Sequence, residues 1–244
     1  MRQLFPSCRD GVDPADGYGT LPPRGDRPGV RVNMISSVDG ATSVGGLSGP
    51  LGGRADERLF MVLRSLADVV VVGAGTMRSE GYGPPRLDEE LQDARRRRQQ
   101  RPVPPIAVVT RSCALDWQAP FFTEATVRPI VLTARAAPAP RRERAADVAE
   151  VVIAGDENVD PRRALVELAR RGARSILVEG GPSLNAQLVS QGILDELCLT
   201  LSPRLAAGDA RRILHGRALE PPVSADVVAV YEEDGFLFFR YRIP

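Results

Sequence analysis

The chain contains no lysine, so all 32 basic residues among its 244 are arginines. Because arginine keeps its proton in proteins, this absence excludes a Schiff-base lysine, a pyridoxal-phosphate anchor, a Walker-type lysine and a lysine general base. The only histidine, His215, leaves one possible base for a Ser-His-Asp triad. A metal site would have to be built mostly from carboxylates, and we expect none.

Cysteines are few, and long apolar runs are missing. Cys8, Cys113 and Cys198 lie far apart without a CxxC pair. An odd number of cysteines behind a start with no export signal predicts a reducing, cytoplasmic location. No apolar run reaches the roughly 18 residues of a membrane span. The formal net charge of +1 is not typical of a nucleic-acid-binding protein. We therefore expect neither a membrane nor a nucleic acid as a partner.

Hydrophobic residues make up 43% of the chain, a value typical of a soluble globular protein. Residues 1–29 mix charges with glycine and proline without any periodicity, which predicts an irregular N-terminal arm. Residues 30–244 are expected to form a single domain.

From residue 30 onward, short apolar runs alternate with helical patterns. This alternation predicts an α/β fold with a mixed, mostly parallel sheet flanked by helices. Continuously apolar runs at 69–72 and 107–110 are typical of strands covered on both faces. Residues 227–243 instead alternate around an EEDG turn, which predicts a C-terminal antiparallel hairpin. Its apolar strand is expected to end the sheet, and because an apolar edge strand would otherwise invite uncontrolled pairing, we expect a homodimer.

Two helices can be placed by their patterns. Residues 54–67 carry leucines at three- to four-residue spacing and acids in the first turn, as an amphipathic helix requires. Residues 86–104 form a charged helix with four consecutive arginines, which we interpret as a solvated face rather than a nucleic-acid site.

Two glycine-rich turns combine a strand end with a helix start, which presents backbone N–H groups to phosphate. The first, at residues 69–86, fails the strict dinucleotide fingerprint because Arg78 stands at its third glycine position. In the second, at residues 176–188, Pro182 is suited to a first helical turn. After a further apolar run, Thr110-Arg111-Ser112 stands where an NAD site would place an acid, which favours the 2′-phosphate of NADP.

Three blocks of sequence carry a family resemblance. They are NMISSVDGATSVGGLSGP, LRSLADVVVVGAGTMRSEGYGP and ILVEGGPSLNAQLVSQGILDELCLTLSP. In this order they resemble the pyrimidine reductase family of riboflavin biosynthesis, the RibD C-terminal domain, whose fold is dihydrofolate-reductase-like. The resemblance covers residues 30–242 and is strongest to a stand-alone, actinobacterial-type branch. It implies NADPH-dependent hydride transfer to a 5-amino-6-(5-phosphoribosylamino)uracil-like substrate.

The resemblance also implies roles for individual residues. Ile35 is expected beside the nicotinamide, and Thr110, Arg111 and Ser112 at the 2′-phosphate. The expected pyrophosphate cradle consists of Gly73, Gly75, Thr76, Gly180, Gly181, Pro182, Ser183 and Leu184. The expected substrate contacts are Ser48, Arg64, Arg86 and Glu179, the two arginines acting as a clamp on the 5′-phosphate. Glu80 is expected to act as the acid or to orient the ribosyl hydroxyls.

The chain departs from the family pattern at two of these positions. Asn33 replaces the family's lysine in the first strand, so we count it with Glu80 as a catalytic position. Glu80 itself stands where the family usually has aspartate. Two alternatives therefore stay open. One is a reductase of another heterocycle such as dihydrofolate, with Asp56 at about the place of the pterin-binding acid. The other is an NADPH-binding protein without catalytic activity.

Overall fold

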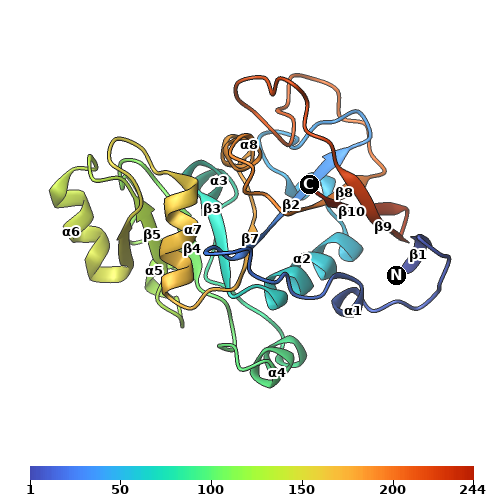
Figure 1. The fold of residues 1–244 in the computed structure, drawn as a ribbon, viewed down its shortest axis with the longest axis horizontal. Helices are drawn as coiled ribbons and strands as arrows, with labels where there is room; N and C mark the ends of the chain where they lie inside the picture. The colour runs from blue at the N-terminus through green and yellow to red at the C-terminus, as the bar shows by residue number, and fades with distance from the viewer.

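The computed structural model describes residues 1–244, and its strands form one continuous ten-stranded sheet (Figure 1). The strands are β1 (Arg2–Phe5), β2 (Gly29–Ser37), β3 (Val69–Gly73), β4 (Ile106–Val109), β5 (Ile130–Thr133), β6 (Glu150–Ile153), β7 (Ser175–Val178), β8 (Glu196–Ser202), β9 (Asp226–Glu233) and β10 (Phe236–Arg242). Their order across the sheet is β1-β9-β10-β8-β2-β7-β3-β4-β5-β6. All pairs from β8 to β6 are parallel, whereas β1, β9 and β10 pair antiparallel. The predicted mixed sheet with a C-terminal hairpin is confirmed.

Helices cover both faces of this sheet. They are α1 (Pro14–Tyr18), α2 (Arg54–Leu66), α3 (Ala74–Ser79), α4 (Glu89–Arg97), α5 (Pro120–Thr123), α6 (Ala139–Val148), α7 (Pro161–Arg170) and α8 (Pro182–Ser190), with a 3₁₀ turn η1 (Gly49–Leu51). One hydrophobic core lies under α1, α2, α3, α5 and α6, and a second lies under α7 and α8 on the opposite face. Continuously apolar strands such as β3 divide their side chains between the two cores.

The first 29 residues differ from the predicted irregular arm. β1 pairs with β9, and α1 begins after Asp13, whose carboxylate caps the helix by accepting from the backbone N–H of Ala15. Tyr18 is 2% exposed and belongs to the first core, where its ring packs against Tyr231. The segment owes its order to pairing with residues more than 200 positions away, which its local sequence does not reveal.

The position of β10 also differs from the prediction. β10 lies between β8 and β9 and pairs with both, so β1 and β6 form the edges of the sheet. An apolar edge strand at the C-terminus therefore gives no argument for a homodimer. The candidate surface for assembly is instead a face of the sheet formed by the antiparallel strands β8, β10, β9 and β1.

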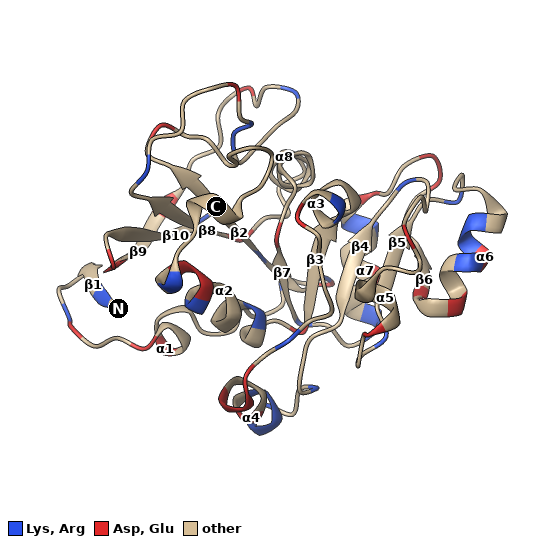
Figure 2. Cartoon of the chain, turned by 180° about the vertical axis from the view of Figure 1, so that it is seen from behind, with Lys and Arg blue, Asp and Glu red and all other residues tan.

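The arginine-rich helix is α4, on which both signs of charge are visible in Figure 2. Arg95 is not a solvated residue, as it is only 1% exposed. Its guanidinium donates to the carbonyl oxygens of Ser65 and Ala67 at the C-terminus of α2, and Arg98 donates to the same Ser65 oxygen. Carbonyls at a helix end have no partners within the helix, so these arginines complete the hydrogen bonding of α2.

Candidate active site

A cavity of about 1370 Å³ opens at the carboxyl ends of β2, β7, β3 and β4. This edge of a parallel sheet is where α/β proteins bind their ligands. Most of the predicted site residues line this cavity, which we call the cleft. They are Asn33, Ile35, Ser48, Arg64, Gly73, Gly75, Thr76, Glu80, Thr110, Arg111, Ser112, Glu179, Gly181, Pro182, Ser183 and Leu184.

The two glycine turns meet and form one floor of the cleft, because β3 and β7 are neighbours in the sheet. The backbone N–H of Gly73 donates to the carbonyl oxygen of Gly180 at 2.7 Å. A side chain at Gly181 would place its Cβ 2.5 Å from the Thr76 hydroxyl oxygen. Gly180 has a φ of +84°, a conformation that glycine adopts without strain. The first turn of α8, which follows, has no side-chain cap. Pro182 has no N–H, and the N–H groups of Leu184 and Asn185 donate to the Gly181 carbonyl oxygen, so the Ser183 N–H is the one left available for an anion.

Helix α2 supplies one wall of the cleft through side chains one turn apart, Asp56, Phe60 and Arg64. Arg64 donates from Nε and Nη2 to the two carboxylate oxygens of Glu179, at 2.7 and 2.8 Å. The Tyr82 hydroxyl donates to Oε2 of the same carboxylate at 2.8 Å. The Arg64 guanidinium also lies 4.2 Å from the centre of the Phe60 ring.

These contacts shift the pKa values of two side chains in this wall, Arg64 and Tyr82. Burial lowers the pKa of Arg64, but the adjacent Glu179 carboxylate more than offsets this and raises the pKa above its ordinary value. Burial and then the Glu179 charge raise the pKa of the Tyr82 phenol. Arg64 therefore remains charged but is already neutralised by Glu179, and both oxygens of Glu179 are in use.

Glu80, just after α3, connects two segments of the cleft. Its Oε1 accepts from the backbone N–H of Ser48 at 2.9 Å. It thereby fixes the glycine-rich loop 43–50 above the end of α3. No hydrogen bond reaches its second carboxylate oxygen, which is free to contact a ligand.

Asp39, from the first family block, NMISSVDGATSVGGLSGP, has a structural role. It accepts from the Ser37 hydroxyl and from the backbone N–H groups of Ala206 and Ala207, the latter at 2.7 Å. These hydrogen bonds lower the pKa of Asp39 to about 2, the bond from Ser37 having the largest effect. Together with Thr42, whose hydroxyl donates to the carbonyl oxygen of Arg211 at 2.7 Å, Asp39 holds loop 203–211 over the cleft.

Two predicted residues are not among those that line the cleft. Gly180 lies directly behind it, at the junction with Gly73. Arg86 does not line it, and its side chain is 79% exposed and lies 3.4 Å from Glu124. The two arginines of the predicted clamp are not brought together here, because Arg64 is paired with Glu179 and Arg86 does not line the cleft.

Several cleft residues were missed by sequence reasoning, chiefly Phe60, Tyr82 and Arg211. Tyr82 belongs to the EGYGP segment and could have been suspected. Arg211 lies in a loop without a pattern, and the hydrogen bonds from Thr42 to its carbonyl oxygen hold it at the cleft. No group of three or more histidine, cysteine and acidic side chains that could hold a metal ion is found.

Comparison with known proteins identifies the family to which the chain belongs. The profile of the RibD C-terminal domain matches residues 28–230. The chain belongs to this family. Its RibD-type sequence is 32% identical over 186 residues to the 2,5-diamino-6-ribosylamino-4(3H)-pyrimidinone 5′-phosphate reductase of Archaeoglobus fulgidus, covering 75% of this chain and 83% of the relative. The reductase of the same name from Aquifex aeolicus is 33% identical over 190 residues, covering 75% and 80%.

Solved structures agree with the fold. A pyrimidine reductase-like protein from Corynebacterium diphtheriae superposes with a TM-score of 0.80 at 28% identity, covering 89% of this chain and 92% of its own. The RibD protein of Acinetobacter baumannii gives 0.72 at 20% identity, with 90% of this chain matched to 59% of that longer protein. The prediction of a riboflavin-pathway pyrimidine reductase is confirmed at the level of the family, and membership in a family of reductases implies a nicotinamide cofactor. No helix has both the length and the apolar character needed to cross a membrane.

Proposed function

We propose that this RibD-type chain uses NADPH to reduce a 6-ribosylaminopyrimidine 5′-phosphate of the 5-amino-6-(5-phosphoribosylamino)uracil class. The observation that carries the proposal is the cleft, in which the glycine junction of β3 and β7 lies beside a substrate wall from α2. The relatives described above are named for a substrate of the same chemical class.

Three features of the cleft fit a nicotinamide cofactor. The cradle at Gly181 and Thr76 has no room for a side chain, which allows a pyrophosphate to approach the backbone. The Asn33 Oδ1 atom is buried without a hydrogen-bond partner, so a bound group can supply the missing donor. Arg111, at the end of β4, forms no ion pair and can take the 2′-phosphate together with Thr110 and Ser112.

Gly73, Gly75, Thr76 and the segment from Gly180 to Leu184 would hold the pyrophosphate, and Ile35 would lie beside the nicotinamide. When bound, the cofactor supplies a hydride to C1′ of the ring-opened ribosylamine. The C1′=N bond becomes CH₂–NH, which also requires one proton at nitrogen. We assign the handling of that proton, or the orientation of the ribosyl hydroxyls, to the free oxygen of Glu80. Ser48, Arg64 and Glu179 would form the substrate wall.

The test is to follow NADPH oxidation with the ribosylaminopyrimidine phosphate. We expect turnover with NADPH and much weaker binding of NADH. In the same assay, Glu80→Gln should lower kcat more than it raises KM, and a change in KM alone would make Glu80 a binding residue only. Binding of NADPH without turnover of any pyrimidine would instead favour the protein without catalytic activity.

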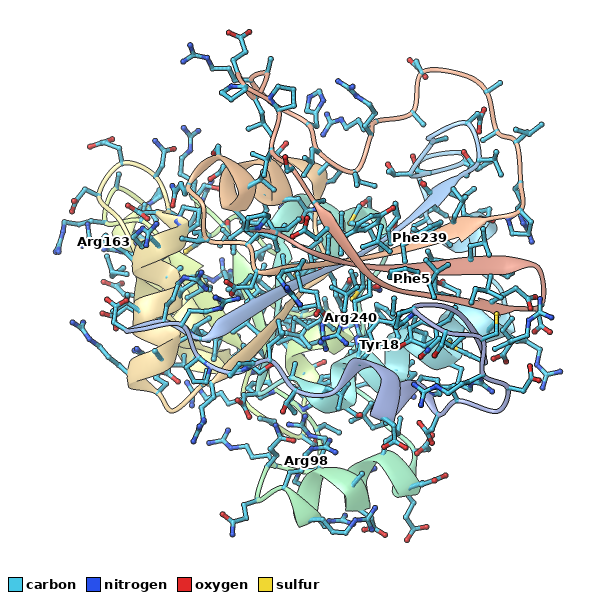
Figure 3. All side chains as sticks on the ribbon, turned by 45° about the vertical axis from the view of Figure 1, so that its right-hand side comes forward. Phe5, Tyr18, Arg98, Arg163, Phe239 and Arg240 are labelled. Carbon is cyan, nitrogen blue, oxygen red and sulfur yellow. The ribbon has the colours of Figure 1, made fainter.

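We also propose that the chain forms a homodimer through the uncovered face of its antiparallel strands. Leu199, Phe239, Val230 and Phe5 stand opposite one another across β8, β10, β9 and β1. None of them belongs to either buried core, and Phe5 is 44% exposed. Figure 3 shows Phe5 and Phe239 near each other, with Phe239 on the opposite side of β10 from Arg240 and Tyr18. A continuous apolar face on this sheet is typical of a subunit interface.

A further inference from the structure

The cleft is lined by four arginines and five carboxylates, and the arginines differ in what they contact. Arg64 is neutralised by Glu179, and Arg78 donates to a backbone carbonyl oxygen at 3.3 Å. Arg111 is assigned above to the 2′-phosphate. The fourth, Arg211, is exposed, and its guanidinium forms neither an ion pair nor a hydrogen bond. It is a positive charge without a partner, in a cleft that receives phosphate groups.

The backbone around Arg211 is fixed beside the predicted pyrophosphate cradle. Thr42 donates to the Arg211 carbonyl oxygen from its N–H and from its hydroxyl, at 3.2 and 2.7 Å. Further along the chain, the Ile213 carbonyl oxygen accepts from an amide side chain of α8 at 3.1 Å. The His215 N–H donates to the carbonyl oxygen of Pro182, in the first turn of α8, also at 3.1 Å. This segment between β8 and β9 therefore packs on the start of α8 (Figure 1).

The cradle itself supplies hydrogen bonds but no positive charge. In the first turn of α8, the Ser183 N–H is the one backbone donor left for an anion. The Thr76 hydroxyl, next to Gly181, is the neighbouring side-chain donor. Both groups are neutral, whereas a guanidinium forms charge-assisted and often paired hydrogen bonds with phosphate oxygens. A pyrophosphate bound in this cradle therefore needs a cation from a neighbouring segment.

We infer that Arg211 is this cation and binds the pyrophosphate of the dinucleotide. The inference rests on the proposed function, from which it takes the cofactor, and it adds a residue that lies outside all three family blocks. The 5′-phosphate of the substrate offers the same chemistry as a second source. Position favours the cofactor, because the segment that carries Arg211 packs on α8, whereas the substrate wall comes from α2.

The binding experiment compares the wild type with Arg211→Gln and with Arg212→Gln. Arg212 is the matched control, because it is the next residue, is equally exposed and does not line the cleft. Each protein is titrated calorimetrically with three probes. NADPH carries every phosphate of the cofactor, adenosine 2′-phosphate lacks the pyrophosphate, and ribose 5-phosphate represents the phosphate of the substrate.

We expect Arg211→Gln to weaken NADPH binding about 10- to 100-fold, as the loss of hydrogen bonds between charged groups does. The affinities for adenosine 2′-phosphate and ribose 5-phosphate should change by no more than about 2-fold, and Arg212→Gln should change none of the three by more than that. Arg111→Gln is the reciprocal variant, and it should weaken NADPH and adenosine 2′-phosphate together.

Unchanged NADPH affinity in Arg211→Gln, or an equal loss in Arg212→Gln, would overturn the inference. A loss of adenosine 2′-phosphate would move Arg211 to the 2′-phosphate, and a loss of ribose 5-phosphate alone would give it to the substrate. Turnover of the ribosylaminopyrimidine phosphate by the wild type would still support the proposed function in all of these cases. Conversely, NADPH binding that depends on Arg211, without turnover of any pyrimidine, would support the inference and overturn the proposed function.

Discussion

At the scale of single residues, the buried pair of Arg64 and Glu179 shows what sequence can and cannot reveal. Both residues are identifiable from the family blocks, but they lie 115 positions apart, and nothing in the sequence shows that each neutralises the other. The same holds for Arg95, which a run of four arginines suggests to be solvated and which is instead buried beneath α2. Pairing and burial depend on the assembled fold rather than on local pattern.

Removing one member of this pair should destabilise the protein. The Arg64 and Glu179 side chains are only 10% and 2% exposed, so Arg64→Met leaves a buried carboxylate without its partner. Such a loss costs about 3–5 kcal/mol, which for a chain of this size lowers the unfolding temperature by roughly 6–20 °C. Differential scanning calorimetry measures the shift in Tm.

The matched control is Arg86→Met, which removes an exposed ion pair with Glu124. It should shift the Tm by no more than about 3 °C. Adding Glu179→Gln to Arg64→Met removes the unpaired charge and should restore part of the stability. Equal losses in the Arg64 variant and the Arg86 control would contradict the role given to the buried pair.

At the scale of elements, long periodic segments were predictable and short ones were not. The leucine spacing identifies α2, and strict alternation identifies the hairpin of β9 and β10. β1 and α1 have four and five residues and no periodicity, and their order comes from β9 and the core. The two glycine turns were each identified as phosphate sites, but their direct contact follows only from the adjacency of β3 and β7.

The contact between these turns predicts coupled effects on the cofactor. In Gly181→Ala, the new Cβ would lie 2.5 Å from the present position of the Thr76 hydroxyl oxygen. The hydroxyl can rotate, so we expect it to leave that position. We therefore expect Gly181→Ala and Thr76→Ala each to weaken NADPH binding about 10-fold, which is the loss of one hydrogen bond to a charged group. Because both remove the same contact, the double variant should be little worse than either single one.

Binding is measured by the change in nucleotide fluorescence on titration. Gly49→Ala is the control, since a Cβ there meets no atom within 4 Å and the residue lies outside the cleft. It should leave NADPH affinity unchanged. Fully additive losses in the double variant would mean that Gly181 and Thr76 act on the cofactor separately.

At the scale of the whole molecule, the sheet order decides which surface is available for assembly. The sequence shows that β10 is apolar at alternate positions, and from this pattern β10 is predicted to be the edge strand that ends the sheet. The structure places β10 inside the sheet, where Phe236 and Phe238 enter the first core while Leu237, Phe239 and Tyr241 face the other side. On that side the Phe239 and Tyr241 rings stack with centroids 5.8 Å apart. No helix covers this face, in contrast to the parallel half of the sheet, where α7 and α8 pack on the equivalent side.

An uncovered face of this kind is stabilised when a second copy buries it, so a charge at its centre should separate the copies. We expect the wild type to sediment as a dimer and Phe239→Asp as a monomer in analytical ultracentrifugation. Leu205→Asp adds the same charge at a leucine that is 79% exposed in loop 203–211 and should leave the dimer intact. Circular dichroism separates loss of assembly from loss of folding. If Phe239→Asp fails to fold, the milder variant Leu199→Ser, at the neighbouring position on β8, should raise the dimer dissociation constant. A wild type that sediments as a monomer at all concentrations would leave the face without a second copy as its partner.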